Sequence, residues 1–83
     1  MEDYLTKETE YTTFIPVGSK AVGKKIKDIE DFGVKVAYYY NNPVTFDDHL
    51  NPKPNIELMT GMGISVVGQR IKIKNLRETL DLP

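Results

Sequence analysis

The chain has 83 residues and therefore room for one domain, because domains rarely fall below about 50 residues. Eleven Lys and Arg residues against twelve Asp and Glu residues give a formal net charge of -1, which offers no long-range attraction for nucleic acid. Without cysteine, the chain cannot form a disulfide, a thiolate zinc site or a cysteine nucleophile. A domain of this size buries only about 60–65% of its unfolded surface, so extra burial in a homodimer is expected.

The pattern of apolar residues also bears on location. The first residues do not place an apolar stretch behind a basic one, as a secretory signal would. No run approaches the roughly 20 apolar residues of a membrane span. We therefore expect a cytoplasmic protein that does not insert into the membrane, so any membrane role would be through a partner.

The N-terminal region predicts a lead-in followed by a strand. Residues 1–10 are acidic and polar and predict a flexible lead-in, and the domain itself is expected over residues 11–83. Residues 11–17 are strand formers, with one face formed by Tyr11, Thr13, Ile15 and Val17 and the other by Thr12 and Phe14. Pro16 places the end of this strand at an edge or a bend.

A short helix is predicted next. After Ser19, the apolar residues Val22, Ile26 and Ile29 recur at helical spacing and predict an amphipathic helix of two to three turns. Gly33 is expected to end the helix, because glycine adopts the left-handed conformation without a Cβ penalty.

Two strands around a turn are expected after Gly33. Residues 34–40 predict a strand buried on both sides, with Val34, Val36, Tyr38 and Tyr40 on one face and Ala37 and Tyr39 on the other. Residues 41–43 form a turn signal, and residues 44–46 predict a short return strand.

The remaining chain predicts a loop, a strand and a C-terminal element. Residues 47–55 are polar, and Pro52 and Pro54 should make this loop stiff. The glycine-bounded residues 64–67 predict a central strand. For the last segment two interpretations are open: a hairpin turn at residues 68–69 with a strand over 70–74, or a helix carrying Ile73, Leu76 and Leu80. The predicted fold is α+β, with a small mixed or antiparallel sheet of about four strands and two helices, in the order β-α-β-β-β-α.

This order of elements is similar to that of the TrkA-C domain, the C-terminal lobe of regulators of potassium conductance. The residues that carry the resemblance cover about residues 14–80 and fall into three groups. They are Gly23, Lys24, Ile26 and Ile29; Gly33, Val34 and Val36; and Pro54, Leu58, Gly61, Ile64, Val66, Val67 and Gly68. The resemblance implies that the last segment is a helix packed on the sheet, which we place at residues 72–80.

The resemblance also implies a function. TrkA-C domains are dimeric regulatory domains of cation transporters and channels, and in some members cyclic di-AMP lies between two protomers. The chain is therefore expected to sense a small ligand, to form a homodimer and to act on a potassium transporter or channel subunit at the inner face of the membrane. No cofactor is required, and cyclic di-AMP or another small molecule is the expected ligand. The predicted ligand-binding residues are Tyr40, Asn41, Asn42, Asn51 and Pro52.

Two positions depart from the family pattern. Met62 occupies the place of an acidic residue after the glycine, and Tyr40 and Asn41 lie where many members have an arginine. An arginine there could pair with a phosphate through two hydrogen bonds, which neither Tyr nor Asn reproduces. This departure favours an alternative, a structural module that dimerises without a ligand.

No pattern predicts catalysis or a metal site. Asp47, Asp48 and His49 carry metal-compatible donors, but adjacent side chains on an extended segment point in alternating directions and seldom converge on one ion. A solvated loop is the better interpretation. His49 has no nucleophile motif to serve, and Gly61, Gly63 and Gly68 lack the Lys-Ser/Thr ending of a phosphate loop. We therefore expect a protein that is not an enzyme.

Overall fold

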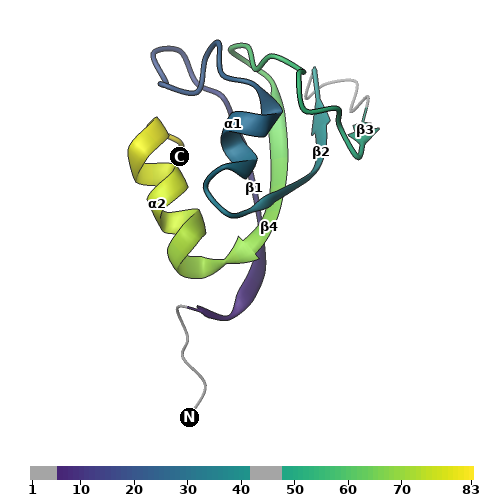
Figure 1. The fold of residues 1–83 in the computed structure, drawn as a ribbon. Helices are drawn as coiled ribbons and strands as arrows, with labels where there is room; N and C mark the ends of the chain where they lie inside the picture. Colours follow the sequence, from purple (N-terminus) through teal and green to yellow (C-terminus); the bar gives the residue numbers. More distant parts are fainter. Residues whose placement is uncertain (1–5, 42–47) are drawn as a thin grey trace.

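The computed structural model describes residues 6–41 and 48–83, and its elements follow the predicted β-α-β-β-β-α order. These elements are β1 (Glu8–Phe14), α1 (Ile26–Glu30), β2 (Lys35–Tyr40), β3 (Asp48–Leu50), β4 (Gly63–Gln69) and α2 (Arg70–Leu80). The four strands form one antiparallel sheet in the order β1-β4-β2-β3. Both helices lie on the same side of this sheet, so the predicted α+β fold is confirmed (Figure 1).

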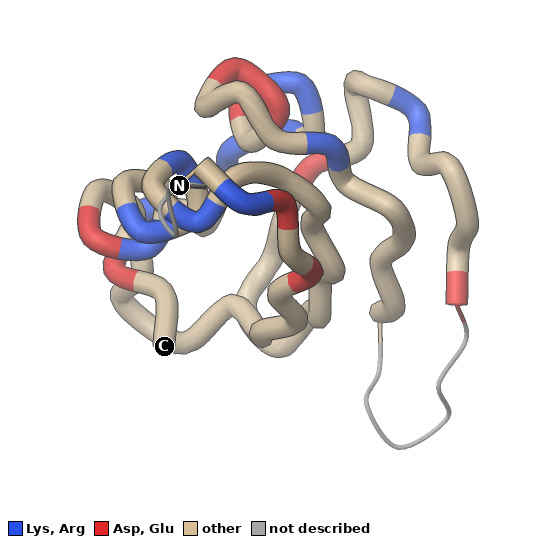
Figure 2. The backbone as a smooth tube through the Cα atoms, turned by 90° about the horizontal axis from the view of Figure 1, so that it is seen from below, with Lys and Arg blue, Asp and Glu red and all other residues tan. Residues whose placement is uncertain are grey.

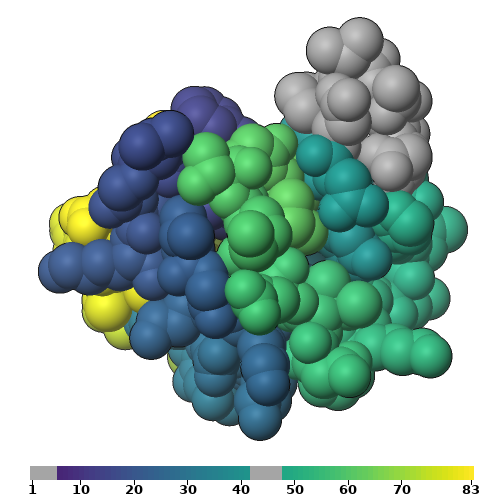
Figure 3. Space-filling model, turned by 90° about the horizontal axis from the view of Figure 1, so that it is seen from above, coloured from purple at the N-terminus to yellow at the C-terminus, as the bar shows by residue number. Residues whose placement is uncertain are grey.

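The hydrophobic core lies between the helices and one face of the sheet. Ile64 and Val66 of β4 have no exposed surface, and Ile29 of α1 and Leu76 of α2 are equally buried. Burial of each such side chain contributes about 1.5–3 kcal/mol, so this two-layer arrangement holds the sheet and helices together. In Figure 3 the green chain leading into β4 lies between the purple end of β1 and the teal end of β2. Strand β3 lies on the side of the molecule away from α2 (Figures 1 and 2).

Strand β1 is shifted towards the N-terminus relative to the predicted strand at residues 11–17. It begins at Glu8, where the pairing Glu8↔Gln69 with β4 starts, and it ends at Phe14. Residues 8–10, which the composition assigned to the lead-in, therefore belong to the strand because they pair with β4. Residues 1–5 of the predicted lead-in lie outside the described residues. The predicted faces are confirmed at Thr13, which is buried, and at Phe14, which is half exposed. The prediction is wrong at Val17, which lies beyond the end of β1 and is exposed.

Helix α1 is much shorter than the predicted two to three turns. The chain before it forms consecutive turns, in which the Val22 amide donates to the Ser19 carbonyl at 3.2 Å. Gly23 has φ +86°, a left-handed conformation that interrupts any helix beginning at Ser19. The helix starts only after Lys25, whose amide donates to Asp28 Oδ2 at 2.8 Å. Gly33 has φ +89° just beyond the helix, as predicted.

Strand β2 contains a bulge that changes which side chains share a face. The register with β4 shifts between Val36 and Tyr38, so Ala37 is an extra residue. As a result Val36 and Tyr39 both face the core and are buried, although a regular strand would place them on opposite faces. The predicted grouping of Val36 with Tyr38 and Tyr40 is therefore wrong.

Strand β3 lies within the segment that was predicted to be a polar loop. Asp48, His49 and Leu50 pair with Tyr40, Tyr39 and Tyr38, respectively. The predicted return strand at residues 44–46 lies outside the described residues. β3 has only three residues, and all three side chains are exposed, so hydrophobic patterning gave no signal for it.

The C-terminal segment is the helix that the resemblance implied. α2 covers the predicted residues 72–80, and Ile73, Leu76 and Leu80 form its buried stripe. The alternative of a hairpin turn at residues 68–69 is wrong, because both residues belong to β4. Arg77 of α2 lies 5.3 Å from the ring centroid of Tyr11, a cation–π contact that joins this helix to β1.

Met62 supports the turn before β4. Its sulfur accepts the Met59 amide at 3.1 Å, and its own amide donates to the Met59 carbonyl at 3.1 Å. The side chain is buried in the core at the same time. Methionine thus both packs in the core and closes the turn.

Within residues 6–41 and 48–83, no helix has the length and apolar character needed to cross a membrane.

Candidate functional site

A hollow of about 330 Å³ lies at the β3 edge of the sheet. Its lining residues come from β2, β3 and the loop that follows β3. They are Tyr39, His49, Leu50, Asn51, Pro52, Lys53 and Ile56. The lining of this hollow thus combines two aromatic rings, a side-chain amide, an ammonium group and apolar side chains, the combination that small-molecule sites commonly show.

Two stacked rings form one wall of this β3-edge hollow. Tyr39 and His49 are cross-strand partners, and their rings are 4.6 Å apart with an angle of 13° between their planes. Tyr39 is buried, whereas His49 is exposed, so the pair extends from the core to the surface. Asn41 Nδ2 lies 3.3 Å from His49 Nε2, which fixes the orientation of the imidazole ring. The bulge at Ala37 brings Tyr39 to this side of the sheet.

The loop after β3 forms the opposite wall. Asn51 has φ +49°, a left-handed conformation that asparagine tolerates, and its backbone N–H donates to the Ala37 carbonyl at 3.1 Å. This bond closes the loop onto the bulge. Pro52 and Lys53 follow, with Pro52 half buried and Lys53 exposed. Lys53 thus adds a positively charged, exposed side chain to the lining of the hollow.

The same loop is joined to the N-terminus of α1 by backbone hydrogen bonds. The Ile26 amide donates to the Ile56 carbonyl at 2.9 Å, and the Lys27 amide donates to the Pro54 carbonyl at 3.0 Å. A bridge between Lys25 and Glu57 continues this contact. The wall of the hollow is therefore fixed to α1, and a ligand that moved the wall would also displace α1.

The predicted site residues are only partly brought together. Asn51 and Pro52 line the hollow, and Asn41 contacts it through His49. Tyr40 lies on the opposite face of the sheet, where its ring covers Gly63. Asn42 lies outside the described residues.

Five residues of the hollow were not among the predicted site residues: Tyr39, His49, Leu50, Lys53 and Ile56. Tyr39 and His49 become partners only through the β2–β3 register, which has no signature in the sequence. Lys53 and Ile56 lie in or next to the proline-containing loop that was predicted to be stiff. Their closeness in sequence to Asn51 and Pro52 was the signal that could have identified them. The structure thus gives His49 a stacking role that the sequence did not predict.

The metal interpretation of residues 47–49 gains no support. Asp47 lies outside the described residues, and Asp48 is on the opposite face of β3 from His49 by strand alternation. Among the described residues, no group of three or more His, Cys, Asp or Glu side chains is arranged to hold a metal ion.

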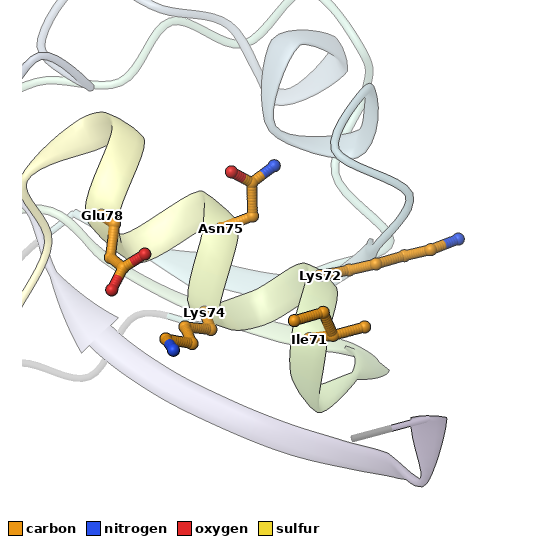
Figure 4. Close-up of a pocket in the computed structure, with 5 residues that line it drawn as sticks. All are labelled: Ile71, Lys72, Lys74, Asn75 and Glu78. Carbon is orange, nitrogen blue, oxygen red and sulfur yellow. The ribbon is translucent and has the colours of Figure 1, made fainter. Parts of the chain in front are cut away.

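Two other hollows lie beside the helices. One, of about 370 Å³, lies on α2 and is lined by Ile71, Lys72, Lys74, Asn75 and Glu78. Figure 4 shows these side chains leaving a single helix in different directions, with Lys74 and Glu78 on one side and Lys72 and Asn75 pointing elsewhere. The other, of about 240 Å³, lies between α1 and α2, where Asp28 and Asp31 accompany Lys24 and Phe32.

Comparison with known proteins gave no match, either to a protein-family model or to a curated protein.

Proposed function

We propose that the chain is a regulatory, ligand-sensing domain of the TrkA-C type that controls the transport of potassium or another cation. It acts as a cytoplasmic homodimer, without catalysis, and reaches the inner face of the membrane through a transporter or channel subunit. The order of elements agrees with that resemblance. The observation that carries the proposal is the β3-edge hollow, which unites Asn51 and Pro52 with the stacked Tyr39–His49 pair.

A cyclic dinucleotide such as cyclic di-AMP suits the groups around this hollow. A planar base can extend the Tyr39–His49 stack on the exposed side of His49, since stacking on aromatic rings tolerates any base. The ammonium group of Lys53 provides the positive charge for a phosphate, in place of the arginine that the family has near Tyr40. The side-chain amide of Asn51 can accept and donate hydrogen bonds at the edge of the base.

The regulatory mechanism is a difference in affinity between two dimer geometries. A ligand shifts an equilibrium only by the ratio of its affinities for the two states. The wall of the hollow is bonded to α1 through Pro54 and Ile56, so occupancy of the hollow is mechanically connected to the helical layer. A transporter attached to the dimer would respond to the geometry that the ligand favours.

A ligand-free dimerisation module is the second candidate. It is favoured by the face of the sheet that neither helix covers and by the absence of an arginine near Tyr40. Under this alternative the chain would dimerise in full without any ligand, and the β3-edge hollow would have no occupant.

Thermal unfolding with a ligand panel separates the two candidates. The panel contains cyclic di-AMP, cyclic di-GMP, ATP, AMP and divalent cations. A ligand at one hundred times its dissociation constant stabilises the fold by about 2.7 kcal/mol, which raises the Tm of a domain of this size by roughly 10 °C or more. A shift of this kind with a cyclic dinucleotide supports ligand sensing, whereas the absence of a shift with every compound leaves the dimerisation module.

Two variants locate the binding. His49→Ala removes the exposed ring of the stack, and a stacking contact of about 1–3 kcal/mol corresponds to a loss of affinity of about fivefold to 150-fold. Lys53→Gln removes the charge from the lining and should weaken binding by a similar factor. Lys74→Gln removes an exposed lysine from α2 and is the matched control, which should bind as the wild type does.

The role in transport is tested in cells that lack the gene. Rubidium uptake should change on deletion and return with the wild-type chain, but not with His49→Ala at equal protein level. Unchanged uptake on deletion would contradict the role in potassium transport.

A further inference from the structure

The second face of the sheet is covered by neither helix (Figure 1). The alternation of side chains along each strand, together with the register between strands, shows which side chains lie on this open face. The open face carries the alternate residues of each strand that point away from the helices. They are Glu8, Glu10, Thr12 and Phe14 of β1, Gly63, Ser65, Val67 and Gln69 of β4, Lys35, Tyr38 and Tyr40 of β2, and Asp48 and Leu50 of β3. Phe14 is 51% exposed and Leu50 is 73% exposed, so the face carries large apolar side chains in contact with solvent.

The open face is ordered into rows that run across the strands. In one row, Glu10 of β1 and Lys35 of β2 flank Val67 of β4. In another, Phe14 and Tyr40 flank Gly63 of β4, and Asp48 of β3 lies beside Tyr40. Between these two rows, Thr12 and Tyr38 flank the buried Ser65. Each row therefore has β4 in its middle, with opposite charges on the two sides of the first row and aromatic rings on the two sides of the second.

We propose that a second copy of the chain packs on this open face, with the two-fold axis of the dimer parallel to β4. Rotation about that axis exchanges β1 and β2 and keeps each row over the same row of the other copy. Glu10 of each copy then meets Lys35 of the other, and Phe14 meets Tyr40. Val67 lies over Val67, and opposite charges meet at two symmetric places.

The packing of such a dimer is physically reasonable. Two stacked sheets lie about 10 Å apart with strand directions about 30° from each other, so residues close to the axis stay opposite their counterparts. Gly63 has no side chain, and the Tyr40 ring already lies over it. The rings of Phe14 and Tyr40 from both copies can therefore fill the space along the axis.

Other arrangements of two copies fit the charges less well. A two-fold axis perpendicular to the strands would place Glu10 or Lys35 over the aromatic row and bury a charge without its partner. Pairing β1 edge to edge would bring the acidic strands of both copies together, and charged edge strands resist such pairing. Charge complementarity thus selects face-to-face packing along β4.

This inference deepens the proposed function, since it rests on dimerisation but not on ligand binding. It is tested by charge reversal, with the dimer dissociation constant measured by sedimentation at low salt. Glu10→Lys and Lys35→Glu each place like charges opposite each other twice per dimer and should weaken dimerisation about tenfold or more. The double variant with both reversals restores opposite pairs and should dimerise within about threefold of the wild type.

Matched controls reverse charges away from the open face. Lys74→Glu and Glu78→Lys lie on α2 and should leave the dissociation constant unchanged. Circular dichroism of each variant establishes that it is folded, which is expected because both Glu10 and Lys35 are exposed. A wild-type chain that stays monomeric at millimolar concentration overturns both the open-face dimer and the dimer of the proposed function. A dimer that ignores the single reversals, or that the double variant fails to restore, overturns the open-face arrangement alone.

Discussion

The close approach of β4 to the start of β2 gives the sharpest stability prediction. A Cβ placed on Gly68 would lie 2.8 Å from Val34 Cγ1, 3.2 Å from its Cβ and 3.3 Å from its Cα. The last of these atoms belongs to the backbone, and Val34 is buried, so its side chain has little room to move away. Gly68→Ala should therefore force the two segments apart.

The magnitude follows from two opposing effects. Overpacking of a filled core costs about 1–3 kcal/mol, whereas replacing glycine by alanine stabilises by about 0.4–1 kcal/mol through the unfolded state. The first effect is larger, so Gly68→Ala should lower the free energy of unfolding by about 1–2 kcal/mol. For a domain of this size the Tm should fall by roughly 5–15 °C.

A double variant separates overpacking from other causes. Val34→Ala removes the closest atom at a cost of about 1–3 kcal/mol. In Gly68→Ala combined with Val34→Ala, the added methyl group occupies some of the vacated space. Urea denaturation should then give a double-variant cost about 1 kcal/mol below the sum of the single costs. Additive costs, or a Gly68→Ala variant more stable than the wild type, would refute this reasoning.

Two further predictions concern the turns that frame the helices. Ser19 Oγ donates to the Leu80 carbonyl at 2.6 Å and accepts a hydrogen bond from the Ala21 amide at 3.0 Å. Ser19→Ala should therefore lower the free energy of unfolding, measured by urea denaturation, by about 2–3 kcal/mol. As a control, Thr79→Ala at an exposed position should lower it by less than about 0.5 kcal/mol. Equal costs for the two variants would show that the Ser19 bonds do not tie the turn to α2. Gly33 has φ +89°, so Gly33→Ala should lower the Tm through about 1–2 kcal/mol of backbone strain, and Gly33→Asn should lower it less. An alanine variant as stable as the wild type would contradict the left-handed turn.

The elements that the sequence predicted well are those in which one local signal agreed with the tertiary structure. β4 is a glycine-bounded apolar run, and α2 has a regular stripe at Ile73, Leu76 and Leu80. α1 was overestimated because Val22 extended the apolar spacing, although Val22 is partly exposed and Gly23 breaks the helix. Periodicity does not report a left-handed glycine within the pattern.

The candidate site was less predictable because it depends on register. Asn51 and Pro52 were identified from the polar, proline-containing loop, and both line the hollow. Tyr40 was assigned to the site by proximity in sequence, but strand alternation takes it to the open face. Tyr39 shares the core face with Val36 only because of the bulge at Ala37, and this face leads into the hollow. A bulge shifts every later residue by one position, and nothing in the tyrosine run marks where it occurs.

The central claim is that the β3-edge hollow binds a small ligand, and the most direct test is a titration of the ¹⁵N-labelled chain with cyclic di-AMP followed by NMR. Saturable changes are expected at the backbone amides of His49, Asn51 and Lys53, with no change at the exposed face of α2 around Lys74. His49→Ala should require about fivefold to 150-fold more ligand for the same change. A spectrum that stays unchanged at millimolar ligand, or changes confined to α2, would contradict the claim.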